Sequence, residues 1–128
     1  MIRGASARPS WIAASGLLLL VGAGGEALAH AKLVSSSPAA NQTVTPPPTS
    51  LTLKFSESIE VRFAQVTLSD AGGTAVKTGS VTQDPGDRAI LIVPLAAPLA
   101  DGQYTVSWQI VAADGHKTKG TYHFISEK

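Results

Sequence analysis

Hydrophobic and polar residues alternate along much of the chain beyond residue 30. Leu51, Leu53 and Phe55 alternate with polar residues, and the apolar positions from Tyr104 to Ile110 do the same. A period of two places such side chains on one face of a β-strand. No window shows a helical period of comparable quality. The pattern therefore predicts an all-β domain whose strands each bury one face.

Seven short segments have strand character, and turn-forming residues separate nearly all of them. Asp70–Gly73 and Asp84–Asp87 have the composition of turns, and the Pro46–Pro48 run requires an extended connection. We expect a seven-stranded β-sandwich. The predicted strands are Lys32–Ser36, Ser50–Phe55, Phe63–Ser69, Ala75–Val81, Arg88–Val93, Gln103–Ala112 and Lys117–Ile125.

The start of the sixth strand favours an immunoglobulin-like sandwich. Tyr104 follows Asp101 and Gly102 as in a tyrosine corner, and Val106 stands where antibody domains have their second cysteine. A plain glycine turn followed by a core tyrosine explains these residues equally well. The alternating pattern also predicts that the aromatic residues of the last two strands, Trp108, Tyr122 and Phe124, belong to the core.

The first part of the chain has a different pattern. Two arginines precede an apolar run over residues 11–23, and Ala27-Leu28-Ala29 has the small-x-small form of a cleavage site. Glycines interrupt this run, which is shorter than the ~20 apolar residues of a membrane span, so a membrane anchor is disfavoured. We expect residues 1–29 to be a cleaved signal peptide and residues 30–128 to form one exported domain without a membrane span. Cleavage would make His30 the first residue.

Composition narrows the chemistry open to this domain. The 128-residue chain has no cysteine, Met1 is its only methionine, and its formal net charge is +1. Disulfides, thiolate metal sites and cysteine nucleophiles are therefore excluded. The near-neutral charge does not indicate a nucleic-acid partner. Histidine remains as the usual nitrogen ligand, at His30, His116 and His123.

The expected strand directions bring distant polar groups to one end of the sandwich. With alternating strands, the start of the first strand, the loop after the second and the loop before the last share one end. These places hold His30, the Ser56–Glu60 segment and the Asp114-Gly115-His116 tripeptide. His123 is out of phase with its apolar neighbours and is expected on the surface, outside the site. This inference depends on the number of strands.

Such a cluster has the donor atoms of a copper(II) site. A terminal His30 offers its amine and Nδ1 to one metal ion, Asp114 adds an anionic oxygen, and His116 adds an imidazole. Three nitrogens and one oxygen in a plane suit copper(II), whereas the thiolates and thioethers that copper(I) prefers are absent. Glu57 is placed to bind axially or to orient a histidine. We expect the site to favour copper(II), and zinc with tetrahedral geometry is an alternative.

Each of these residues also has a plainer interpretation. His30 is then an arbitrary residue near a cleavage site, and Asp114-Gly115-His116 is an ordinary polar hairpin tip. Glu57 and Glu60 are then solvated loop carboxylates. The combination of the first two features favours the metal site over these separate explanations.

Four stretches together resemble the CopC family of periplasmic copper-binding proteins. The resemblance implies a Greek-key sandwich or barrel of cupredoxin-like type. It also implies that copper(II) is bound by the amine and ring of His30, by Asp114 and by His116, with Glu57 matching the family's acidic residue near the site. The matching stretches are His30–Pro38, Leu53–Glu57, Gly102–Trp108 and Asp114–Phe124.

The resemblance also suggests a function and a partner. Some family members carry a methionine-rich copper(I) loop, but this exported domain has no methionine, so a single copper(II) site is expected. The expected function is that of a monomeric periplasmic carrier or sequestering protein in copper resistance or homeostasis, without catalysis. A CopD-like inner-membrane copper transporter would be a separate chain.

Two further classes of function remain open at the sequence level. An N-terminal histidine brace also occurs in oxidative copper enzymes, although so small a domain leaves little room for a substrate platform. An aspartate in the copper plane would also occupy the position that oxygen needs. The other alternative is an exported immunoglobulin-like interaction module that binds no metal.

Overall fold

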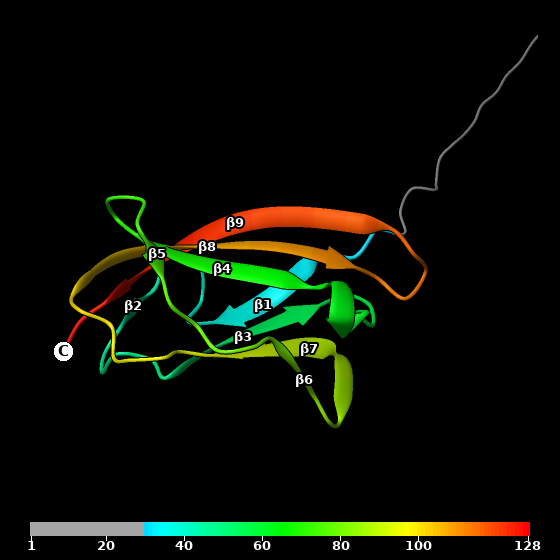
Figure 1. Ribbon diagram of the computed structural model, residues 1–128, viewed down its shortest axis with the longest axis horizontal. Coiled ribbons are helices and arrows are strands. Elements are labelled where there is room, and N and C mark those ends of the chain that lie inside the picture. Colours follow the sequence, from blue (N-terminus) through cyan, green and yellow to red (C-terminus); the bar gives the residue numbers. More distant parts are fainter. Residues whose placement is uncertain (1–29) are drawn as a thin grey trace, which may run out of the picture.

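Two β-sheets packed face to face make up residues 30–128, the part of the chain that the computed structural model describes (Figure 1). The first sheet has the strand order β1-β3-β7-β6, and each neighbouring pair is antiparallel. The predicted signal peptide, residues 1–29, lies outside the described residues. The strands of this sheet are β1 (Leu33–Ser37), β3 (Ser50–Phe55), β6 (Thr82–Asp84) and β7 (Asp87–Pro94).

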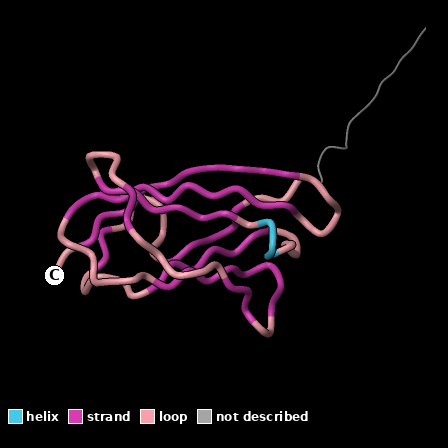
Figure 2. Tube along the Cα trace, in the orientation of Figure 1, coloured by secondary structure: helices cyan, strands magenta, loops and turns pink. Residues whose placement is uncertain are grey.

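The second sheet has the strand order β2-β9-β8-β4-β5, in which β2 and β9 are parallel and the other pairs antiparallel. Within the described residues, helix occurs only as the 3-10 turn η2 (Val61–Phe63), shown in cyan in Figure 2. No helix in this part of the chain is long and apolar enough to cross a membrane. The strands are β2 (Thr43–Val44), β4 (Gln65–Asp70), β5 (Ala75–Val76), β8 (Gly102–Val111) and β9 (Lys117–Ser126).

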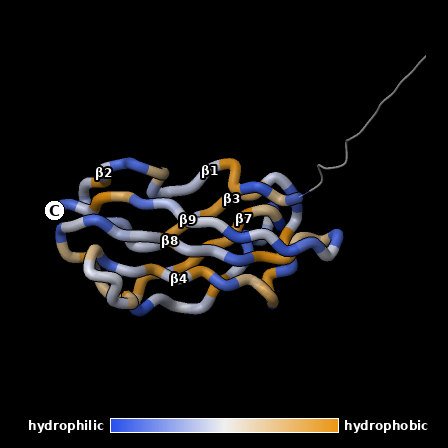
Figure 3. The backbone as a smooth tube through the Cα atoms, turned by 90° about the horizontal axis from the view of Figure 1, so that it is seen from above, coloured by the Kyte–Doolittle hydropathy of each residue, from blue (hydrophilic) through white to orange (hydrophobic). Residues whose placement is uncertain are grey.

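The core lies between the sheets and is built from the alternating positions, visible in Figure 3 as orange segments along β3, β4 and β7. Phe55 of the first sheet meets Trp108 of the second edge to face, with ring centroids 5.1 Å apart. Tyr104 and Phe124 stack within the second sheet at 5.7 Å. The predicted burial of Trp108, Tyr122 and Phe124 is confirmed. The all-β sandwich is confirmed with it.

The number of strands differs from the prediction. Over residues 30–128 the structure has nine strands, not seven. β3 has the predicted bounds, but the expected strand Ala75–Val81 is wrong, because only β5 at its start pairs as a strand. The chain then leaves the second sheet and enters the first as β6. Strands as short as β2 and β6 carry too few residues to show an alternating pattern.

Local turn chemistry follows the sequence closely. The Tyr104 hydroxyl donates a hydrogen bond to the Ala100 carbonyl at 2.8 Å, which is the contact of a tyrosine corner, and Val106 is fully buried. The Gly73 amide donates to the Asp70 carbonyl at 2.9 Å, which confirms the first predicted turn. The second predicted turn joins β6 to β7. The tyrosine corner and the first turn lie at the end of the sandwich opposite the predicted site. The second turn lies at the same end as the site, where the Ile59 amide donates to the Arg88 carbonyl at 3.0 Å.

Candidate metal centre

The chain directly after His30 is fixed by contacts to both sheets. The Ala31 side chain is 3% exposed, and its carbonyl accepts a hydrogen bond of 3.1 Å from the Thr118 hydroxyl of β9. On the other side, the Lys32 amide donates to Ser56 Oγ and the Ser56 amide donates to the Lys32 carbonyl, both at 2.9 Å. These bonds tie the start of the domain to β9 and to the loop that follows β3.

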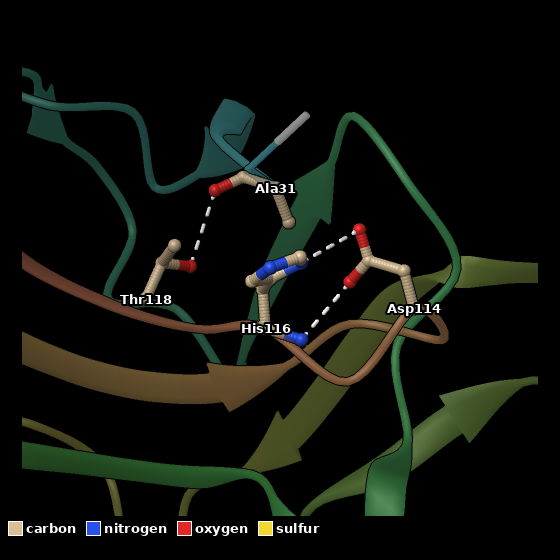
Figure 4. A network of polar contacts seen from close by, with 4 residues as sticks. All are labelled: Ala31, Asp114, His116 and Thr118. Atoms are coloured by element: carbon tan, nitrogen blue, oxygen red, sulfur yellow. Dashed lines mark hydrogen bonds and ion pairs between the residues drawn. The ribbon is translucent and has the colours of Figure 1, made fainter. Parts of the chain in front are cut away.

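The loop between β8 and β9 is a tight turn that presents Asp114 and His116. The Gly115 amide donates to the Ala112 carbonyl at 2.8 Å, and Gly115 adopts a φ of 91° that favours glycine. The His116 amide donates to Asp114 Oδ1 at 3.0 Å, while Asp114 Oδ2 lies 3.2 Å from His116 Nδ1 (Figure 4). The aspartate therefore holds both the backbone and the ring of the histidine.

The loop after β3 lies against this turn. The Ala113 amide donates to the Ser58 carbonyl at 2.9 Å, and Ile59 forms an isolated bridge with Ala112. Glu57 is half-buried in this loop, and the described residues give its carboxylate no hydrogen bond to either histidine. The three places predicted to share one end of the sandwich are thus adjacent, although the strand count was wrong.

The two histidines of this end are in direct contact. The rings of His30 and His116 have centroids 5.0 Å apart and meet edge to face at 89°. The side chains of His116 and Asp114 are 56% and 35% exposed, so the pair lies at the surface. His123, as predicted, is exposed elsewhere, on β9, with Nδ1 3.4 Å from Thr105 Oγ1.

Hydrogen bonding favours the charged form of the aspartate. The His116 backbone amide, followed by the His116 ring, lowers the pKa of Asp114 below its usual value of 3.8. A carboxylate that accepts such bonds stays ionised in mildly acidic solution. The site thus carries a fixed negative charge beside two imidazole rings.

The side chains alone do not form a closed metal cage. Within residues 30–128, no group of three or more His, Asp or Glu side chains stands in an arrangement that could hold a metal ion. The Asp114 carboxylate is turned onto the ring of His116. The expected His30 amine is not a side-chain donor, and it is part of a peptide bond in the uncleaved chain.

Two supporting residues were not found by sequence reasoning. Thr118 reaches Ala31 across the sandwich, and the Gln83 side chain of β6 donates to the carbonyls of Ile59 at 2.8 Å and Arg88 at 2.7 Å. The alternation of β9 indicates that Thr118 points inward. Its bonding partner, however, depends on how β9 packs against the segment that follows His30, and no local sequence pattern indicates that packing.

The described residues form a small β-sandwich with two histidine rings in contact at one end. The profile of the CopC domain matches residues 33–126, and the chain belongs to the CopC family. Protein YobA of Escherichia coli K12 is 45% identical over 96 residues, which cover 75% of this chain and 77% of that protein. Copper resistance protein C of Xanthomonas campestris pv. juglandis is 35% identical over 107 residues, covering 80% and 84%.

A solved structure supports the same assignment. The crystal structure of PcoC, described as a methionine-rich copper resistance protein from Escherichia coli, superposes with a TM-score of 0.70 at 30% identity, covering 77% of this chain and 100% of that chain. The resemblance noted from sequence is therefore confirmed. The names of these relatives agree with the expectation that the chain is not an enzyme.

Proposed function

We propose that this protein is a periplasmic copper(II)-binding protein that carries or sequesters the ion in copper resistance or homeostasis. The observation that carries the proposal is the contact between the His30 and His116 rings, with Asp114 bound to the second ring. The copper-related names of its relatives support the choice of metal. Export and removal of residues 1–29 are part of the proposal, because they create the terminal amine.

The proposed ligands are the amine and Nδ1 of His30, an imidazole nitrogen of His116 and a carboxylate oxygen of Asp114. Asp114 Oδ2 lies 3.2 Å from Nδ1 of His116, so we propose that the carboxylate turns from this ring nitrogen toward the ion when the metal binds. Glu57, half-buried in the neighbouring loop, is the proposed axial or orienting carboxylate.

The donor set favours copper(II) over copper(I). Nitrogen and oxygen donors suit the tetragonal preference of copper(II), and copper(I) prefers the sulfur of cysteine and methionine. Residues 30–128 contain neither of these residues. The relative PcoC, by contrast, is described as methionine-rich. We therefore propose one copper(II) site per chain.

Exposure of the site supports a role in carrying the ion. More than half of the His116 side chain is accessible, and the site lies at the end of the sandwich. A metal bound at such an edge can be taken over by ligands of another protein without unfolding of the carrier. A separate CopD-like membrane transporter is the proposed recipient, and the carrier is proposed to act as a monomer.

Metal analysis of the exported protein tests this function. The full chain, expressed with residues 1–29 and purified from the periplasm, should begin at His30 by mass spectrometry and bind one copper(II) in preference to zinc. Recovery outside the periplasm would contradict the proposed location. A sample that starts at His30 and binds neither ion would contradict the function and favour an interaction module without metal.

A further inference from the structure

Thr118 connects the two histidines of the site through the backbone. It lies on β9 two positions after His116, and its hydroxyl donates 3.1 Å to the carbonyl of Ala31, the residue after His30 (Figure 4). The bond joins residues 87 positions apart and is partly buried. The Thr118 side chain therefore links β9, the strand that follows His116, to the peptide that follows His30.

Other contacts already hold the opposite side of this peptide. Ser56 bonds the amide and the carbonyl of Lys32, and the Ala31 methyl group is buried. These contacts tie the amino-terminal segment to β3, whereas Thr118 ties it to β9, the strand that continues from His116. Contacts to β9 and to Ser56 hold the backbone around Ala31. The positions of the His30 donor atoms then depend on the backbone and side-chain dihedral angles of His30 itself.

We propose that Thr118 is a positioning residue that sets His30 relative to His116 and thereby tunes the copper site. This inference rests on the proposed function. Thr118 binds no metal itself, because its hydroxyl is directed at the Ala31 carbonyl. Residues that orient metal ligands from outside typically change metal affinity by about 10- to 100-fold when they are replaced.

The chemistry of threonine suggests a matched pair of substitutions. Valine has the same branched shape but no hydroxyl, so Thr118→Val removes the donor while keeping most of the packing. Serine keeps the hydroxyl and loses only the methyl group, so Thr118→Ser should retain the bond. Thr121→Val is the control, because Thr121 is exposed on the same strand.

The first measurement is made on the exported protein without metal. We expect Thr118→Val to speed amide hydrogen exchange at Lys32 and to shift the NMR signals of Ala31, while Thr118→Ser and Thr121→Val leave both close to wild type. Unchanged exchange and unchanged signals in Thr118→Val would overturn the inference. This result does not depend on whether the protein binds copper.

The second measurement is copper(II) titration with electron paramagnetic resonance. Thr118→Val should lower the affinity about 10-fold or more and change the spectrum, whereas Thr118→Ser should restore both. Equal losses in the valine and serine variants would overturn the role of the hydroxyl. Absence of copper binding by the wild type would instead contradict the proposed function, and the metal-free measurement would still decide whether Thr118 positions Ala31.

Discussion

The ring of His30 lies edge-on against the ring of His116, with centroids 5.0 Å apart. One histidine begins the described chain and the other lies in the loop between β8 and β9. β1 pairs with β3, and Ile59 in the loop after β3 bridges to Ala112, just after β8. The fold itself therefore brings together the two imidazoles on which the proposed function depends.

Replacing His116 tests its role in copper binding separately from any role in folding. Because its side chain is 56% exposed, His116→Ala should change the free energy of unfolding by only about 0.5 kcal/mol, while copper(II) affinity falls strongly. His123→Ala is the matched control, since His123 is an exposed histidine outside the site. Calorimetric titration and thermal unfolding check both variants. Equal copper affinity in His116→Ala and His123→Ala would exclude His116 as a ligand.

Acid should release copper through the nitrogen donors and not through the carboxylate. An amine and imidazoles must be neutral to bind metal, and histidine charge generally changes between about pH 8 and pH 5. The pKa of Asp114 is lowered below 3.8, so this carboxylate stays ionised through that range. Copper(II) affinity measured against pH should therefore begin to fall before the carboxylate titrates.

Asp114→Asn provides the control for this pH profile. The variant keeps an oxygen for the His116 amide but loses the negative charge, so copper affinity should fall at every pH without a new transition. A copper(II) affinity that stays constant between about pH 8 and pH 5, and falls only where carboxylates titrate, would contradict nitrogen ligation.

Gly120 tests how the core of the second sheet is packed. A Cβ atom at this position would lie 2.6 Å from a ring carbon of Trp108, and a buried tryptophan has little room to move. Gly120→Ala should therefore destabilise the domain by about 1–3 kcal/mol, measured by urea unfolding. Gly72→Ala, whose nearest atom would be 3.5 Å away, should be close to neutral. Equal stability of the two variants would contradict this packing.

The tyrosine corner should contribute to stability but not to copper binding. Tyr104→Phe removes the hydrogen bond to the Ala100 carbonyl, which is 2.8 Å long, and should cost about 0.5–1.5 kcal/mol. Tyr104 lies near the start of β8, away from the loop that carries His116. Unfolding and copper titration check this variant together. A loss of copper affinity without a loss of stability would contradict both assignments.

The predictable parts of this fold are those with strong local patterns. The alternation of Leu51, Leu53 and Phe55 predicts the bounds of β3. The position of Tyr104 at the start of a strand indicates the tyrosine corner. β2 and β6 were missed because their pairing depends on distant strands that supply the partners. The crossing from β5 to β6 likewise depends on how the two sheets pack, and no short stretch of the sequence indicates that packing.

The candidate site was predictable to a similar extent. His30, Asp114 and His116 could be placed at one end from strand direction alone, since each lies at the end of a strong strand. Thr118 could not, because its hydrogen bond to Ala31 depends on how β9 and the amino-terminal segment meet. The cleavage that would free the His30 amine remains a prediction.

The most direct test of the copper(II) assignment compares two amino termini. Exported protein that begins at His30 should bind one copper(II) and give a tetragonal electron paramagnetic resonance spectrum with several nitrogen ligands. A form with one additional residue before His30 should bind about 100-fold more weakly or worse, because the amine no longer chelates together with the ring. Equal affinity and the same spectrum in both forms would contradict the proposed site.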